Sequence, residues 1–385
     1  MSAKRKKPSA VRRNSGSSQP PPEVFPKRDK IQIGSSQINP SDFRGLHEAW
    51  KRKQLVIFLG AGVSIPYGLP SWKNLVLELL FEQAQHTKGL GELWPHYRRA
   101  LASWMMDYFA YDPLVLGRMI ERDIRKHPER NEGKAFIDKL RERLYANQTA
   151  NPSPSAPLKA VARLIAGNTP EHGVAAAVSF NYDDLLEQEL RALDVTVAPV
   201  IDSTRRNEPG FPVVHPHGYV PSQGSADRGT LVFTEDDYHK LTDTAFHWSL
   251  SELVIYLRKH TVLFVGLSMS DPNLRRLLDA CRNSLIPPHW QIQKRHTVRD
   301  SEMDEVIADV DRRARQYEDI MDFPKRKGKP QMQEAIRGAL RQADTYDREV
   351  FQSMGVKTIW IEDWADLTPL IDSIPGKDRH TEPGS

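Results

Sequence analysis

The sequence predicts an α/β fold with a doubly wound parallel sheet. Residues 55–59 and 261–265 are two runs of almost uninterrupted apolar residues, a pattern typical of strands buried on both faces. Further strand patterns at 174–180, 211–217 and 356–361 alternate with helical patterns. This alternation favours parallel strands joined by crossover helices, and hence a Rossmann-like sheet covered by helices on both faces.

The other elements follow from cap signals and periodicity. Asn39-Pro40-Ser41-Asp42 predicts a helix to about residue 53, and Ser71 predicts the cap of the next helix. Residues 92–147 have apolar residues at helical spacing and are interpreted as a helical insertion, at about 86–150, packed beside the sheet. Trp104 and Tyr108, at positions i and i+4, are expected in its core. A further short helix is expected to end at residue 166. Other expected helices are at 184–193, 234–259, 271–281 and 366–374, and other expected strands are at 231–233 and 289–294.

Composition and charge limit the class of protein. Of the 385 residues, 39% are hydrophobic and 27% charged, and no apolar run reaches the roughly 20 residues of a membrane span. The N-terminus has no apolar signal core, so a cytoplasmic protein without membrane contact is expected. The single cysteine, Cys281, excludes an internal disulfide and any zinc site built from four cysteines, and is expected to be a buried apolar residue.

The net charge of +4 is concentrated at the N-terminus. Residues 1–38 hold nine Lys and Arg against two acidic residues, whereas the rest of the chain has 45 basic and 48 acidic residues. We expect 1–38 to be a disordered basic tail, since its composition offers little to bury. Such a tail is most simply solubilising, with nucleic acid contacted only through it or through a partner. Residues 39–295 are expected to form the main folded domain, and residues 353–376 the closing strand and helix of that same domain. Residues 296–352 are expected to be a charged helical insertion, and residues 377–385 a disordered tail.

Polar or glycine-rich segments follow four of the predicted strands. They are Gly60-Ala61-Gly62-Val63-Ser64, Asn181-Tyr182-Asp183-Asp184, His217-Gly218, and Gly266-Leu267-Ser268-Met269-Ser270-Asp271. Ligands of a doubly wound sheet bind beyond the carboxyl ends of its strands, so these segments are expected to meet in one cleft. The two glycines after residues 55–59 would let a phosphate approach bare N–H groups, although the third glycine of the dinucleotide fingerprint is replaced by Ile65.

Several of these residues also have simpler interpretations. Asn181 could cap a helix, and Asp184 is better explained as a cap than as a catalytic group. His215 and His217 would lie on the same face of a strand, so either could be a base, and the His-Gly pattern favours His217. Asp236 and Asp237 are expected to be solvated at a helix start.

The order of these four segments resembles a sirtuin. The matching pattern is Gly60-Ala61-Gly62-x-Ser64 with a following Gly68-Leu69-Pro70, then Asn181-x-Asp183, His217-Gly218 and Gly266-x-Ser268. The strand at 356–361 and the helix after it resemble the closing elements of that family. The resemblance covers roughly residues 45–295 and 355–374.

The cysteine count separates the chain from protein-deacylating sirtuins, whose zinc module uses four cysteines. The sequence is similar instead to the zinc-free sirtuin-like domains of bacterial anti-phage defence systems. That resemblance implies a hydrolase that cleaves NAD⁺ to ADP-ribose and nicotinamide and acts by NAD depletion, with NAD as substrate and no zinc. It also implies a homo-oligomer and a separately encoded partner such as a hexameric translocase ATPase or an Argonaute-like protein.

The resemblance further implies a role for each residue. Asn181 would position the water and the nicotinamide ribose, and His217 would polarise a ribose hydroxyl or the water. Asp183 would bond the nicotinamide carboxamide or the ribose. Gly60, Ala61, Gly62 and Ser64 would hold the pyrophosphate and adjoining ribose, Gly266 and Ser268 would close over the adenosine, and Asp271 would cap the next helix while facing the site. The alternatives are a zinc-free NAD-dependent protein deacylase and a nucleotide-sensing module without catalysis.

Overall fold

A computed structural model describes residues 30–86, 89, 92–243, 247–282, 288–315 and 328–376. Its centre is a seven-stranded parallel sheet in the order β5-β6-β4-β3-β7-β8-β9. The strands are β3 (Leu55–Leu59), β4 (Val174–Ser179), β5 (Val197–Val200), β6 (Phe211–Val214), β7 (Thr261–Val265), β8 (His289–Lys294) and β9 (Val356–Ile361). The predicted doubly wound α/β fold is confirmed.

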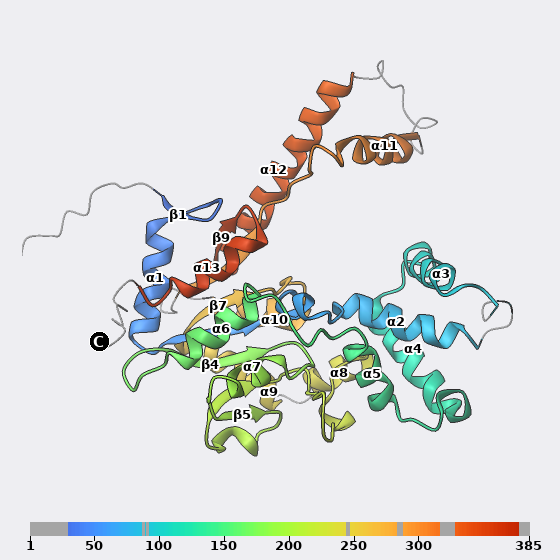
Figure 1. Cartoon of the computed structure of the whole chain (residues 1–385), viewed down its shortest axis with the longest axis horizontal. Coiled ribbons are helices and arrows are strands. Elements are labelled where there is room, and N and C mark those ends of the chain that lie inside the picture. The colour runs from blue at the N-terminus through green and yellow to red at the C-terminus, as the bar shows by residue number, and fades with distance from the viewer. Residues whose placement is uncertain are drawn as a thin grey trace, which may run out of the picture.

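Alternating side chains of β3 supply both faces of the sheet. Leu55, Ile57 and Leu59 pack into one core, with α1 (Pro40–Lys51), α6 (Pro157–Ala166) and α13 (Leu367–Asp372). Val56 and Phe58 pack into the other, with α9 (Trp248–Lys259) and α10 (Pro272–Cys281). Every residue of β3 is buried, which explains the apolar run, and Cys281 is a buried free thiol as expected. The fold is therefore a three-layer α/β/α arrangement (Figure 1).

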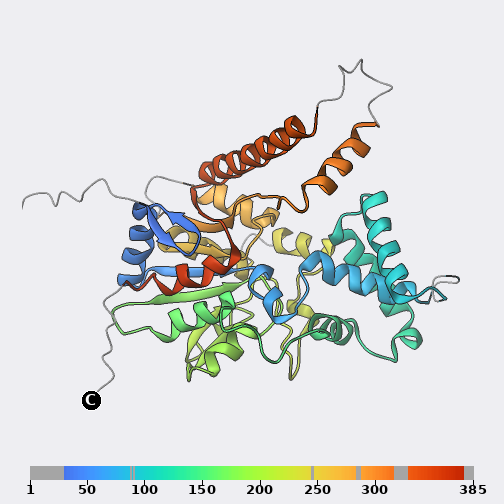
Figure 2. The same ribbon diagram turned by 45° about the horizontal axis from the view of Figure 1, so that its top comes forward.

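The helical insertion is a bundle of separate helices at one end of the molecule (Figure 2). It contains α3 (Pro95–Tyr108), α4 (Pro113–Lys126), η3 (Pro128–Asn131) and α5 (Phe136–Tyr145), and it packs against α2 (Trp72–Ala84), which precedes it. A buried ion pair between Glu82 of α2 and Lys139 of α5, 2.9 Å apart, joins the insertion to α2. The expectation that Trp104 and Tyr108 lie in the core is wrong. Their side chains stack on each other but are 51% and 67% exposed.

Residues 31–38, which the sequence placed in a disordered tail, are folded. Residues 31–38 form a hairpin of β1 (Ile31–Ile33) and β2 (Ser36–Ile38), and residues 1–29 lie outside the described part of the chain, as do 377–385. Asp366 holds the hairpin, because its carboxylate accepts hydrogen bonds from Ser35 N (3.1 Å), Ser35 Oγ (2.6 Å) and Ser36 Oγ (2.5 Å). This contact spans more than 300 residues, so the local composition did not reveal it.

Three other element predictions also change. The expected strand at 231–233 follows a short helix, η5 (Arg228–Thr230), and its apolar side chains are buried without sheet pairing. The expected helix at 234–259 is two helices, α8 (Glu235–Asp243) and α9, with α7 (Leu185–Arg191) following β4 as predicted. The edge strand β5 was missed; it contains Pro199, a residue confined to edges and bulges in sheets.

The region after β8 forms an arm of two helices, α11 (Met303–Ala314) and α12 (Lys329–Ser353), which projects from the sheet beside β9 (Figures 1 and 2). Asp344 and Phe351 are the buried residues of α12, and both lie in the half that approaches the sheet. The outer half of the arm therefore exposes charged side chains, as the sequence predicted for this region. None of the described helices is long and apolar enough to cross a membrane.

Candidate active site

The predicted site residues lie in loops at the carboxyl ends of β3, β4, β6 and β7. These four strands are neighbours, in the order β6-β4-β3-β7. From β3 the chain passes first to β4 on one side and later returns to β7 on the other side. The loops after these strands, which we call the carboxyl edge (residues 60–64, 180–184, 215–218 and 266–271), thus surround the point where ligands bind in doubly wound sheets.

Glycines allow the loops after β3 and β7 to touch. Gly62 N donates to Gly266 O at 2.9 Å, and a Cβ on Gly62 would lie 2.8 Å from Gly266 Cα. A Cβ on Gly60 would lie 2.6 Å from both Gly266 O and Leu267 Cα. Gly266 has a φ of +64°, a conformation that favours glycine. The sequence predicted a free Gly62 N–H for a phosphate, but this N–H is bonded within the protein. Ala61 begins a short helical turn, η1 (Ala61–Val63).

Ser64, Asn181 and Asp183 form a hydrogen-bonded network below the loops. Asn181 Nδ2 donates to Gly60 O and to Ser64 Oγ, each at 3.0 Å. Ser64 Oγ in turn donates to Asp183 Oδ2 at 2.8 Å, and Asp183 Oδ1 accepts from Leu185 N at 3.2 Å. The network ties the loop after β4 to the loop after β3, so Asn181 positions the glycine segment through its amide nitrogen.

Burial governs the chemistry of Asp183. The residue is 6% exposed, and burial raises the pKa of its carboxyl group to about 6, against the hydrogen bonds from Ser64 and Leu185 that favour the charged form. Ser64 is also buried, at 2% exposure. Both side chains are therefore placed to hold the loops rather than to face a substrate.

His215 lies in a closed ion pair. Its imidazole has no exposed surface, and Nε2 is 2.7 Å from Glu187 Oε1, on α7. Burial alone would disfavour the charged imidazole, but the Glu187 carboxylate outweighs it, and the pKa of His215 lies above its usual value. Because β6 ends at Val214, the two-residue strand period does not extend to His215 and His217, and the two rings have different surroundings.

His217 faces Asp271 and two aromatic rings. Its Nε2 is 3.5 Å from Asp271 Oδ2, and the rings of Phe180 and Tyr238 lie 5.1 and 5.7 Å from its own. Tyr238 OH donates to Asp271 Oδ2 at 2.7 Å, and Asp271 Oδ1 caps α10 by accepting from Leu274 N. Burial lowers the pKa of His217 below its ordinary value, while the Asp271 carboxylate opposes this shift. At neutral pH the ring is uncharged and can accept a proton.

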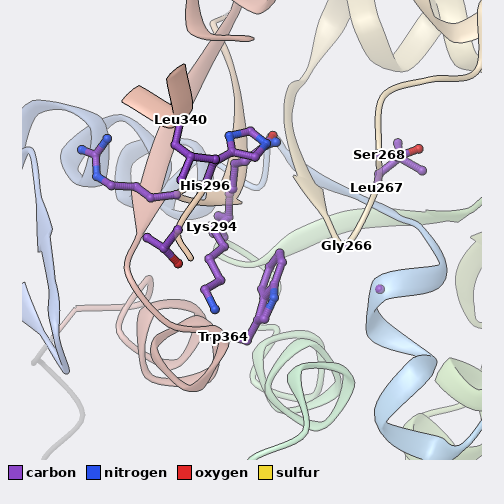
Figure 3. A pocket seen from close by; sticks show the side chains of 12 residues that line it. Gly266, Leu267, Ser268, Lys294, His296, Leu340 and Trp364 are labelled. Atoms are coloured by element: carbon purple, nitrogen blue, oxygen red, sulfur yellow. The ribbon is translucent and has the colours of Figure 1, made fainter. Parts of the chain in front are cut away.

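A pocket opens on the β7–β8 side of the glycine loops and encloses about 510 Å³. Figure 3 shows Lys294, His296 and Trp364 on one side of it and the Gly266–Ser268 loop on the other. Ser268 Oγ is 2.7 Å from Ser270 Oγ, and Leu340 of α12 also lines the pocket. Its further lining residues are Gly62, Leu267, Ile292, Gln293, Arg295 and Thr297. The side chains at the end of β8 already have carboxylate partners: Arg295 pairs with Glu362 at 3.0 Å and His296 with Asp344 at 2.8 Å. Lys294 has the longest contact, 4.0 Å from Asp363, and is the cation best placed to meet an anionic ligand.

The ten predicted site residues do not all lie at the pocket. Gly62, Gly266 and Ser268 line the pocket, whereas Asn181 and His217 do not. They are nevertheless linked to it, since Asn181 bonds the residues on both sides of the Ala61–Val63 turn. The structure therefore brings the predicted residues to one edge, with the pocket on the β7–β8 side and the histidine on the β6 side.

Two acidic residues differ from expectation. Asp184 occupies the cap position of α7, but its side chain makes no cap hydrogen bond and instead accepts from Tyr145 OH at 2.9 Å. Asp237 is buried and ion-paired with Arg228 at 2.7 Å, whereas Asp236 is half exposed and pairs with Arg118. Buried carboxylates need such partners, which come from distant segments.

Sequence reasoning missed several residues that lie beside the carboxyl edge. Lys294, Arg295 and His296 follow the predicted strand 289–294, so the rule applied to the other strand ends would have found them. Tyr238 and Glu187 lie on helices and carry no local signal. Within the described ranges, no group of three or more His, Cys, Asp or Glu side chains is arranged to hold a metal ion.

The fold and the four loops define a Rossmann-like α/β protein with its polar groups at the strand-order switch point. Comparison with protein families extends this: residues 175–322 match the model of the SIR2-like domain. The chain thus contains a sirtuin-like domain, as the resemblance predicted, and this supports an NAD-related enzymatic function. The matched segment includes Asn181, His217, Gly266 and Asp271 but begins after the Gly60–Ser64 loop. A comparison with curated proteins found no match.

Proposed function

We propose that the protein hydrolyses NAD⁺ to ADP-ribose and nicotinamide. The observation that carries this proposal is the placement of Asn181 and His217 at one edge of the sheet, beside the glycine loops and inside a SIR2-like domain. Nicotinamide is a pyridinium in NAD⁺, so it leaves as a neutral base when its bond to C1′ of the ribose breaks. The leaving group needs no acid, and one base suffices for the attacking water.

His217 is the candidate for that base. The oxygen of water would bond to C1′, the electron pair of the C1′–N bond would leave with nicotinamide, and the proton of the water would pass to the imidazole. An uncharged ring at neutral pH suits this role, and the lowered pKa of His217 favours it. His215 is excluded as the base because its ring is buried against Glu187.

The rest of NAD⁺ would extend from Asn181 toward the pocket between β7 and β8. Gly62, Gly266 and Ser268 would line its path, and Lys294, which lies 4.0 Å from Asp363, would turn to the pyrophosphate and balance part of its charge. In this proposal Ser64 and Asp183 hold the loops and make no direct contact with the substrate, since both are buried and bonded to each other.

The test is to incubate the purified full chain with NAD⁺ and quantify nicotinamide and ADP-ribose. His217→Ala should reduce turnover about a hundredfold to ten-thousandfold, the range for removal of a general base. His239→Ala is the matched control, because His239 is an exposed histidine on α8 outside the carboxyl edge. Full hydrolysis by both His217→Ala and Asn181→Ala would contradict the proposal. Acyl-peptide turnover without hydrolysis would instead indicate a deacylase, and unchanged NAD⁺ a sensing module.

We further propose that this activity serves anti-phage defence by NAD depletion, in a homo-oligomer or with a separately encoded partner. The arm of α11 and α12, which projects from the sheet, is the candidate contact surface (Figure 2). Cells that express the chain should lose NAD after phage infection, and cells that express His217→Ala should not. Size-exclusion chromatography with light scattering gives the oligomeric state.

A further inference from the structure

A second cavity lies where the helical insertion packs against α2, away from the carboxyl edge. It encloses about 340 Å³ between α2, α3, α4 and η3. Its apolar wall is formed by Leu80, Ala84, Leu101, Ala102, Met105, Met119 and Ile120, and its polar side chains are Gln83, Arg98, Asp123 and Arg130. None of these residues belongs to the site proposed for NAD⁺. Cavities that proteins leave empty are apolar, and this one is not.

The orientation of the Gln83 amide is fixed by its neighbours. Asn131 Nδ2 donates to His127 O at 3.1 Å, so Asn131 Oδ1 is the acceptor and Gln83 Nε2 donates to it at 3.0 Å. This leaves Gln83 Oε1 without a hydrogen-bond partner among the described residues, although the side chain is only 8% exposed. A buried carbonyl oxygen without a partner costs free energy, and an N–H or O–H group of a ligand would satisfy it.

Arg98 has a buried hydrogen-bond donor that lacks an acceptor among the described residues. Its Nε is buried and also lacks a hydrogen-bond partner in the described structure, and its guanidinium lies over the ring of Phe81, 5.1 Å from the centroid. It forms no ion pair with any described carboxylate. Arg99, the next residue, instead pairs with Glu78 at 2.8 Å on the surface. An acidic group in the cavity would supply both the acceptor and the charge that Arg98 lacks.

We propose that this cavity binds a small amphipathic anion. Its apolar body would lie against the apolar wall that includes Leu80 and Met105. At one end it would carry an acidic group for Arg98 and a hydrogen-bond donor for Gln83 Oε1. Two of the side chains that line this cavity, Gln83 and Arg98 on adjacent helices, each carry a buried polar atom without a partner, and these two atoms require opposite hydrogen-bonding groups. Water could satisfy them singly but would leave the apolar wall wet. The inference does not depend on NAD⁺ hydrolysis.

Anilinonaphthalene sulfonate is a suitable probe, because it combines two apolar ring systems, a sulfonate and an N–H group. Titration of the full chain should give a saturable fluorescence increase with one site per chain. Arg98→Met should weaken binding at least about tenfold, the effect of losing a charge-assisted hydrogen bond. Arg99→Met is the matched control and should bind like the wild type.

Two further variants keep the test decisive. Ala102→Phe fills the cavity without removing a charge and should also abolish saturable binding, even if Arg98→Met proves unstable. Trp104→Ser removes the exposed ring that stacks on Tyr108, the competing surface for an aromatic probe. Wild-type affinity in both Arg98→Met and Ala102→Phe, or loss of binding in Trp104→Ser alone, would overturn the proposal, as would the absence of a saturable site.

Discussion

Asp183→Asn should stabilise the protein at neutral and alkaline pH. The wild-type carboxyl group has a pKa of about 6 in the folded protein, raised by burial from an ordinary 3.8. The ionised form therefore destabilises the fold. The loss of folding free energy caused by the ionised carboxylate is absent well below pH 3.8, grows between pH 3.8 and 6, and is constant above pH 6. The difference between the two pKa values corresponds to about 3 kcal/mol.

Asparagine removes the charge and can keep the hydrogen bonds. Its Oδ1 can accept from Leu185 N as Asp183 Oδ1 does, and its Nδ2 can donate to Ser64 Oγ, which then rotates its own proton. No cavity results, but the Ser64 hydroxyl proton loses its acceptor, which offsets about 1 kcal/mol or more of the gain. The variant should thus gain about 1–2 kcal/mol in the free energy of unfolding at pH 8, and the gain should shrink toward pH 5.

Urea unfolding of wild type and Asp183→Asn at several pH values between 5 and 8 measures this difference. The gain in the free energy of unfolding should increase with pH and level off above pH 6 to 7. Asn168→Asp is the comparison for adding a charge at a partly buried site away from the carboxyl edge: the side chain keeps the bond from Val174 N and loses the one to Val174 O, so this variant should be destabilised. A difference that is constant across the pH range, or a destabilised Asp183→Asn variant at pH 8, would refute the assignment of a buried, reluctantly ionised carboxyl group.

Three further variants probe the edge and the N-terminal hairpin. Asp271→Asn removes a negative charge 3.5 Å from His217 Nε2, so the acid limb of the pH dependence of NAD⁺ hydrolysis should move to lower pH. Gly62→Ala places a Cβ 2.8 Å from Gly266 Cα and should lower the free energy of unfolding by about 1–3 kcal/mol in urea titration. Asp366→Ala removes three hydrogen bonds to the β1–β2 hairpin and should cost about 2 kcal/mol, with faster amide exchange in that hairpin.

Each of these variants has a comparison that separates the stated cause from general damage. Asparagine is as good a helix cap as aspartate, so an unfolded Asp271→Asn variant would contradict the expected retention of α10. Gly338→Ala, in the exposed part of α12, has one atom within 4 Å of its added Cβ, at 3.9 Å, and should not destabilise. The pKa of Asp366 is lowered by the Ser35 and Ser36 hydrogen bonds against burial, so its contribution should be present at neutral pH and lost as pH falls.

Local sequence determined the sheet and the position of the site. An apolar run such as Leu55–Leu59 needs burial on both faces, and a parallel strand between two helical layers provides it. Because parallel strands end at the same edge, the residues after each run had to meet there, and Asn181 does bond to Gly60 and Ser64. The same rule applied to strand 289–294 would have added Lys294 and its neighbours.

Only the tertiary structure decided what each of those residues can do. His215 and His217 look alike in sequence, yet one is sealed against Glu187 and the other faces Asp271. Their pKa values depend on burial and on carboxylates that lie 28 or more residues away along the chain. The hairpin at 31–38 likewise depends on Asp366. Periodicity shows which face of a helix or strand is apolar. The charged neighbours and the burial of a side chain depend instead on distant segments that the fold brings together, so no local sequence pattern predicts them.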